Sequence, residues 1–203
     1  MFYQTKDGNH GLPHDPFKAL VAPRPIGWIT AMSALGDINL SPYSFFNIIA
    51  DNPKMVAFSS GGKKDALSFI EETGEFVCNL ATYDLREQMN LTSAPFPRGV
   101  NEMERAGLKE APSVTVRPPR VAEAPAALEC KWIQTVPLVG IDGAGPNYYL
   151  VIGQVTAIHI DDRFIVDGLV DTAAMQLIQR AGYHDYFTVL PEGRFEMKRP
   201  QTV

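Results

Sequence analysis

The chain has 203 residues, a hydrophobic fraction of 45% and a formal net charge of −5. This length and composition fit one domain, residues 1–203, with a core of ordinary size. A mildly acidic chain repels polyphosphate, which disfavours nucleic acid as a partner. The chain opens without a basic, apolar leader and has no apolar run long enough to span a bilayer. We therefore expect a cytoplasmic protein without membrane association.

Residues 1–22 are expected to form an irregular lead-in. The apolar runs that follow are separated by turn residues, which predicts three consecutive strands. These strands are expected at 26–33, 38–49 and 54–60, and the first two form a hairpin through Leu35-Gly36-Asp37.

A helix is predicted over 66–73, with Asp65 as its cap and Gly74 as its left-handed stop. A strand at 75–81 and a short helix at 83–90 come next. Residues 93–112 hold three prolines and alternate in charge, which predicts a surface excursion with a short helix around 103–106. The two cysteines, Cys78 and Cys130, lie in apolar runs and are expected to be buried, reduced thiols.

Two long, largely apolar runs at 127–140 and 147–160 are separated by a polar loop, which predicts a second hairpin. An apolar stripe with helical spacing, which includes Leu177 and Ile178, predicts a last helix over 172–182. Strands outnumber helices and most neighbours connect as hairpins. The fold class is therefore predicted to be mainly β, an antiparallel barrel with peripheral helices.

Side chains that can donate hydrogen bonds gather at the ends of the second and third predicted strands. They are Asn39, Ser41, Ser44, Asn47, Ser59, Ser60, Lys63 and Lys64. Cations beside a helix start suit a phosphate group. The alternative is ordinary turn chemistry with a solvated lysine pair.

Three aromatic side chains, Trp28, Tyr43 and Phe46, are candidates to wall a flat ring, with a place in the core as the alternative. His184 follows the last predicted helix, either as its cap or as part of a ligand site. The one pair of histidines at HxxxH spacing, His10 and His14, lies in the irregular lead-in. We therefore predict no metal site, and we nominate no catalytic base or nucleophile.

An ordered set of motifs extends over nearly the whole chain. It consists of APRPIGWIT (22–30), NLSPYSFFN (39–47), FSS (58–60), KKD (63–65), TGEFVCNL (73–80), VIGQVTAIHI (151–160) and RAGYHDY (180–186). In these motifs the chain resembles the flavin reductase-like family of FMN-binding split barrels, in the branch of flavoredoxins and of reductase components of two-component monooxygenases.

The resemblance implies a six-stranded antiparallel split barrel and a homodimer with one FMN per subunit near the interface, where the partner subunit closes the pocket. FAD is the alternative flavin. The residues that the resemblance adds to the predicted flavin site are Arg24, Thr30, Pro42, Arg180, Tyr183 and Tyr186. The family often has threonine where this chain has Ala66, and Lys63 is the candidate to compensate for that lost hydroxyl.

The function implied is an NAD(P)H:flavin oxidoreductase, in which NAD(P)H is a transient co-substrate. The reduced flavin that this enzyme produces would serve a monooxygenase or another electron acceptor. A flavoredoxin-like electron carrier without nicotinamide activity and a cofactor-free interaction barrel are the alternatives. A protein that positions two rings for hydride transfer needs no acid–base pair, and none is seen here.

Overall fold

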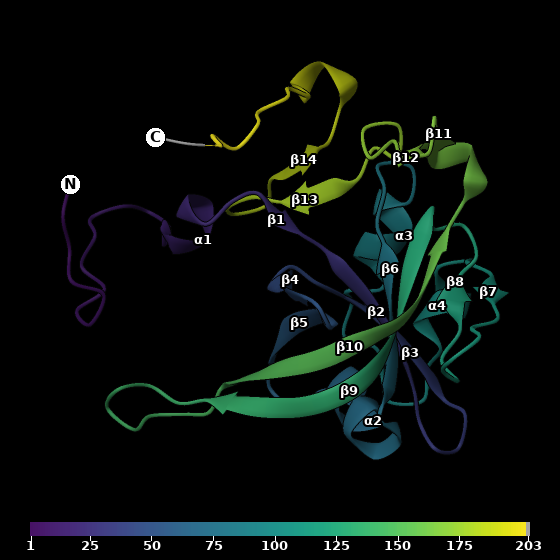
Figure 1. Ribbon diagram of the computed structural model, residues 1–203. Helices are drawn as coiled ribbons and strands as arrows, with labels where there is room; N and C mark the ends of the chain where they lie inside the picture. The colour runs from purple at the N-terminus through teal and green to yellow at the C-terminus, as the bar shows by residue number, and fades with distance from the viewer. Residues whose placement is uncertain (202–203) are drawn as a thin grey trace.

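The computed structural model describes residues 1–201. Its main feature is a seven-stranded antiparallel sheet with the order β3-β2-β6-β9-β10-β5-β4 (Figure 1). In chain order these strands are β2 (Gly27–Met32), β3 (Ile38–Tyr43), β4 (Phe46–Asp51), β5 (Lys54–Gly61), β6 (Glu75–Leu80), β9 (Ala126–Leu138) and β10 (Tyr148–Ile160).

The two outer strands of this sheet, β3 and β4, are consecutive in the chain and are joined only by Ser44 and Phe45. Because so short a link connects them, the sheet must curl until its two edges approach each other. The Ser59 N–H of β5 donates to the Phe45 carbonyl at 2.8 Å, and this hydrogen bond fixes the β3–β4 junction against β5. The mainly β, split-barrel fold class is thereby confirmed, with one strand more than expected.

The extra strand arises where the sequence predicts one continuous strand over 38–49. The chain leaves the sheet at Ser44-Phe45, and β4 turns back to pair with β5. The β2–β3 hairpin pairs Gly27 with Tyr43, and the long β9–β10 hairpin pairs Tyr148 with Leu138, so both predicted hairpins are confirmed.

Seven short strands and six short helices lie around the barrel. They are α1 (Phe17–Leu20), β1 (Arg24–Pro25), α2 (Asp65–Thr73), α3 (Arg86–Leu91), α4 (Glu102–Arg105), β7 (Glu110–Ala111), β8 (Arg120–Val121), η1 (Asp162–Phe164), β11 (Ile165–Val166), β12 (Leu169–Val170), β13 (Ile178–Arg180), β14 (Tyr186–Thr188) and η2 (Pro191–Gly193). Within residues 1–201, no helix is long and apolar enough to cross a membrane.

Helix α2 has the predicted apolar face and closes the barrel with it, but the prediction of Asp65 as its cap is wrong, because Asp65 is the first helical residue and Lys64 is the N-cap. Phe69 and Ile70 are almost fully buried in the same cluster as Phe58 and Phe76 of the strands. Gly74 ends the helix with a φ of 74°, a left-handed conformation that favours glycine. Cys78 and Cys130 belong to this cluster as buried, free thiols, which confirms their prediction.

The segment 93–112 is more than the predicted surface excursion. Its helix α4 lies close to the expected position, but Met103 is fully buried and packs in a second apolar cluster with Trp28 and Leu40. Glu102, also buried, accepts hydrogen bonds from the Asn39 side chain and the Leu40 N–H. The segment therefore covers one end of the barrel.

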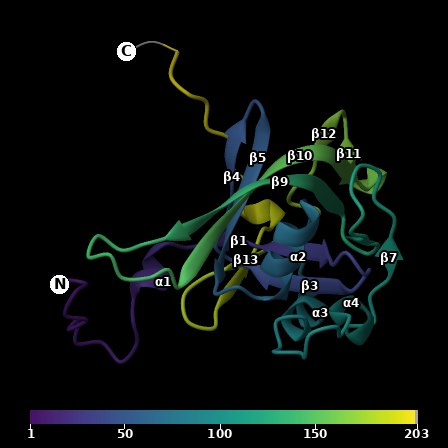
Figure 2. The same ribbon diagram turned by 90° about the horizontal axis from the view of Figure 1, so that it is seen from below.

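The predicted helix over 172–182 is wrong. Ile178–Arg180 forms strand β13, which pairs on one side with β1 and on the other with β14. Gln176, just before it, has a φ of 49°, which a right-handed helix excludes. Residues of the two chain ends thus form one small sheet, Arg24 opposite Arg180, beside the barrel (Figure 1). Seen from below, α1 and the tip of the β9–β10 hairpin project on one side of the molecule, with α3, α4 and β7 on the other (Figure 2).

Candidate functional site

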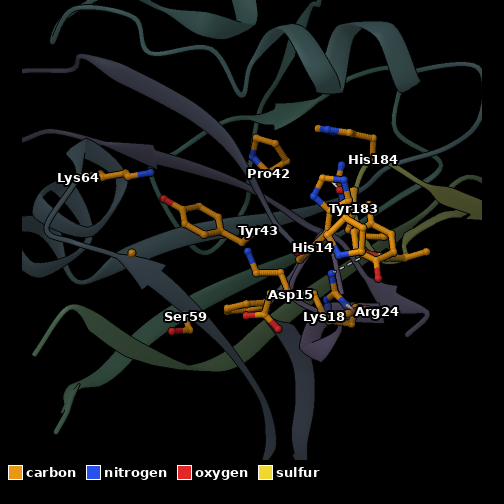
Figure 3. Close-up of a pocket in the computed structure, with 16 residues that line it drawn as sticks. His14, Asp15, Lys18, Arg24, Pro42, Tyr43, Ser59, Lys64, Tyr183 and His184 are labelled. Carbon is orange, nitrogen blue, oxygen red and sulfur yellow. Dashed lines mark hydrogen bonds between the residues drawn. The ribbon is translucent and has the colours of Figure 1, made fainter. Parts of the chain in front are cut away.

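A cavity of about 700 Å³ lies between the β3–β4 junction, the end of β5 and the small sheet formed by the chain ends. This volume is in the range of small-molecule sites. Its lining residues are Pro13, His14, Asp15, Lys18, Arg24, Pro42, Tyr43, Ser44, Phe45, Ser59, Gly61, Lys64, Arg180, Ala181, Tyr183 and His184. In the close-up, Lys64 lies at one end, Arg24 and Lys18 lie at the other, and Tyr43 stands between them (Figure 3).

The first end of the cavity carries hydroxyl and ammonium groups. Lys64 occupies the N-cap position of α2, where the first N–H groups of the helix have no intrahelical acceptor. The Ser59 side chain also lines the cavity, and its Oγ is buried without a hydrogen-bond partner among the described residues. A buried, unpaired hydroxyl is costly unless a ligand or water satisfies it. Together these groups form an end that suits an anion with several oxygen acceptors.

The second end of the cavity is built around the buried guanidinium of Arg24. Its Nη1 donates to the carbonyls of Lys18 and Val21, both at 2.6 Å, and its Nη2 donates to the Ala181 carbonyl at 3.0 Å. Burial, followed by the nearby charge of Arg180, lowers the pKa of Arg24 from its ordinary value. Arg24 therefore joins the lead-in to the chain end, and its Nε remains buried without a partner among the described residues.

Arg180 forms the wall next to Arg24. Its Cζ lies 4.5 Å from the centre of the Tyr186 ring, and its Nη2 donates to the Tyr183 carbonyl. Tyr183 has a φ of 53°, and its ring lies 5.7 Å from that of His14. With Lys18 and His184, this end of the cavity concentrates basic groups, and Asp15 is the one carboxylate among the lining residues.

The structure brings half of the predicted site residues together around this cavity. They are Arg24, Pro42, Tyr43, Ser44, Ser59, Lys64, Arg180 and Tyr183. Burial raises the pKa of Tyr43, and a hydrogen bond with Ser60 lowers it by a smaller amount, so the pKa is about 12. The phenol of Tyr43 is therefore neutral at physiological pH and can serve as a wall or a donor, but not as a base.

Four other predicted residues point into the protein, because alternate residues of a strand face opposite sides. Trp28 is fully buried, and its Nε1 donates to Thr92 Oγ1 at 2.9 Å. Thr30 accepts a hydrogen bond from Asn79, and the Ser60 hydroxyl donates to the Gly62 carbonyl. Phe46, the third aromatic candidate, packs against the core. None of these side chains lines the cavity.

Asn39 and Ser41 line a neighbouring hollow of about 430 Å³, which shares Pro42, Tyr43 and Lys64 with the main cavity. Asn39 donates to Glu102 Oε1 at 2.7 Å, and burial raises the pKa of that glutamate. This hollow thus continues the lysine end of the site but adds two carboxyl groups, those of Asp65 and Glu102.

The last three predicted residues lie apart. Lys63 does not line the cavity, since its Nζ pairs with Glu71 Oε2 at 3.1 Å, so it does not replace the hydroxyl that Ala66 lacks. Asn47 is exposed on β4, where its side chain accepts from the Ile48 N–H. Tyr186 faces an adjoining cavity on the far side of Arg180.

Sequence reasoning missed the contribution of the lead-in. His14, Asp15 and Lys18 line the cavity although they belong to a segment without periodic pattern. No signal in the segment itself indicates this role, since it depends on the pairing of β1 with β13. For His184, the ligand-site alternative is the one that agrees with the structure, because it lines the cavity and follows no helix.

Comparisons with known proteins agree with the fold. An uncharacterized protein of Deinococcus radiodurans is 36% identical over 183 residues, 84% of this chain and 77% of its own length. The crystal structure of nitrilotriacetate monooxygenase component B from Bacillus cereus superposes with a TM-score of 0.82 at 30% identity, and covers 93% of this chain and 96% of its own. The 2-nitrobenzoate 2-nitroreductase of Pseudomonas fluorescens superposes with a TM-score of 0.85 at 25% identity, and covers 100% of this chain and 98% of its own.

The family comparison covers most of the barrel. The flavin reductase like domain matches residues 20–172, which include β1 to β12 and the lysine end of the cavity. With the split-barrel sheet and the motifs in order, this match establishes that the chain belongs to the flavin reductase like family.

Proposed function

We propose that the protein binds FMN in the 700 Å³ cavity and reduces it with NAD(P)H. One observation supports this most strongly. Three groups lie at one end of a cavity of ligand size: the buried Ser59 hydroxyl, which has no hydrogen-bond partner among the described residues, Lys64 and the N-terminus of α2. Those groups would hold the phosphate. The family membership supports a flavin as the ligand.

The protein's own groups would bind and orient. Pro42 and Tyr43 would wall the ring, and the Ser44-Phe45 link, which lies outside both strands, would place backbone N–H groups beside it. FMN, when bound, supplies the hydride acceptor. The protein contributes the positions of the two rings, and no side chain of the cavity is required to move a proton. The basic end would attract the anionic nicotinamide nucleotide.

The purified protein tests this proposal directly. We expect it to bind FMN, seen as a visible spectrum perturbed on titration, and to oxidise NADH or NADPH in a manner that depends on FMN. A yellow protein that reacts with neither nucleotide would contradict the reductase and favour the carrier alternative. A protein that retains no FMN and shows no turnover would contradict both.

A nitroaromatic acid is the second candidate substrate, because one structural match over the full chain is a nitroreductase of 2-nitrobenzoate. The basic wall of Arg24, Lys18 and Arg180 is suited to a carboxylate. Adding 2-nitrobenzoate to the assay with FMN and NAD(P)H shows whether the flavin or the nitroaromatic acid is the terminal substrate. Reduction of the nitro group by the protein, at the expense of NAD(P)H and faster than free reduced flavin alone achieves, would assign the acid as the terminal substrate.

We also propose that the protein is a homodimer that closes the cavity with its partner subunit. Edge strand β4 exposes Ile48 and Ile49, which are 63% and 50% accessible, and the nearby hairpin tip exposes Leu138 and Val139. Unpaired apolar edges of this kind are usually covered. Light scattering is expected to give about twice 22.4 kDa for the wild type, and the Ile48→Lys variant is expected to shift toward the monomer. A monomeric wild type would contradict the proposal.

We further propose that a monooxygenase or another electron acceptor uses the reduced flavin.

A further inference from the structure

A second cavity adjoins the proposed flavin site. It has a volume of about 370 Å³ and lies between α3 and the β13–β14 pair. It is lined by Tyr83, Arg86, Glu87, Met89, Asn90, Ile178, Arg180, His184, Tyr186 and Thr188. Arg180 and His184 line both cavities, so these two side chains form the wall between them.

Two arginines in this cavity are held against tyrosine rings. The Arg86 Cζ lies 4.0 Å from the centre of the Tyr83 ring, and its Nη1 donates to the Tyr83 carbonyl at 2.7 Å. Arg180 is held in the same way over Tyr186, at 4.5 Å. Such stacking orders a guanidinium without using its fork of donors fully. The cavity therefore presents two ordered cations.

The same cavity also offers surfaces for a flat ring. Tyr83 and Tyr186 are 45% and 39% accessible, so part of each ring remains open. Asn90 and Thr188 supply an amide and a hydroxyl. Glu87 is the only carboxylate among the lining residues, and Arg86 Nε approaches its Oε1 at 3.5 Å. An acidic group in a nucleotide site commonly accepts from ribose hydroxyls.

We propose that this second cavity binds the adenosine diphosphate half of NAD(P)H, which rests on the proposed function. In this proposal the nicotinamide ring lies over the flavin in the first cavity, and the pyrophosphate and adenosine lie in the second. The cations of Arg86 and Arg180 suit the phosphates, and the tyrosine rings suit the purine. Because Arg180 and His184 line both cavities, the dinucleotide would cross from one to the other at this shared wall.

ADP-ribose, which lacks the nicotinamide, is the probe that isolates this half. Its dissociation constant for the protein, with and without FMN, can be measured by calorimetry. Arg86→Gln removes a charged donor and is expected to raise that constant about tenfold, with the FMN dissociation constant and melting temperature unchanged. Tyr83→Leu, a change at an exposed ring, is expected to weaken ADP-ribose as well. Arg105→Gln loses the same charge at an exposed position of helix α4, outside both cavities, and is expected to bind as the wild type does.

Two outcomes distinguish the failure of this inference from failure of the proposed function. If FMN-dependent NAD(P)H oxidation holds but ADP-ribose binds equally to the wild type and to both cavity variants, the second cavity is not the adenosine site. If ADP-ribose binding depends on Arg86 and Tyr83 while no flavin is bound or reduced, the nucleotide site stands and the flavin reductase proposal is overturned.

Discussion

Replacing Lys64 with alanine is expected to weaken FMN binding about tenfold and to leave riboflavin binding nearly unchanged. The reason is that riboflavin lacks the phosphate that Lys64 and the α2 N-terminus would hold, and a hydrogen bond to a charged group contributes more than a neutral one. Quenching of flavin fluorescence on titration measures both dissociation constants. The expected difference falls with added salt, because Lys64 is exposed in the absence of ligand.

Lys63 provides a matched control for this experiment. It is the adjacent residue with the same charge, but its Nζ pairs with Glu71 at 3.1 Å and it does not line the cavity. Lys63→Ala is therefore expected to change FMN binding little. Equal losses of FMN and riboflavin in the Lys64 variant, or equal losses of FMN in both lysine variants, would contradict the phosphate assignment.

Replacing Glu129 with glutamine is expected to lower the free energy of unfolding at pH 7 by about 3 kcal/mol. Glu129 is fully buried in β9, far from the cavity in the fold, and accepts from the N–H groups of Val114 and Thr115, from the Thr115 hydroxyl and from His159 Nε2. Burial alone would raise its pKa, but hydrogen bonds led by those from Thr115 and His159 lower the pKa to about 2. A glutamine amide would turn an NH₂ group toward these donors.

The loss of unfolding free energy in the Glu129 variant is expected to depend on pH. Because the pKa of Glu129 is lower in the folded protein than its ordinary value of 4.5, its contribution is full above about pH 5 and is lost as the pH falls toward 2. The difference in unfolding free energy between wild type and variant, from urea titrations, is therefore expected to shrink with acid. Glu72→Gln, at an exposed position on α2, is the control and is expected to change stability little. A Glu129 variant as stable as the wild type at pH 7 would contradict this account.

The barrel was predictable because its signals are local. The β2–β3 and β9–β10 hairpins combine apolar runs with short polar turns, and α2 combines an apolar stripe with a glycine stop at Gly74. The break at Ser44-Phe45 was not predictable from periodicity, because apolar residues continue across it. The break depends on the pairing of β4 with β5.

The helix predicted over 172–182 failed for a similar reason. Its apolar spacing fits a helix, yet the structure buries Ala173, Met175 and Ile178, and leaves Ala174 exposed. Pairing of β13 with β1 and β14 outweighs the local preference. The lysine end of the site was predictable from one contiguous stretch, 59–64. The arginine end was only partly predictable, since it requires residues far apart in the sequence to meet.

The small sheet that joins the chain ends has a consequence for how members of this family can diverge. The family match stops at residue 172 and starts at residue 20, so it leaves out His14, Lys18, Arg180, Tyr183 and His184, which line the basic end of the cavity. Arg24 ties the two excluded segments together through the carbonyls of Lys18 and Ala181. In the proposed function, the two terminal segments would contact the second substrate, while the lysine end of the cavity would hold the flavin phosphate. Because Arg24 joins the two segments, chimaeras that exchange one segment without the other are expected to lose recognition of that second substrate.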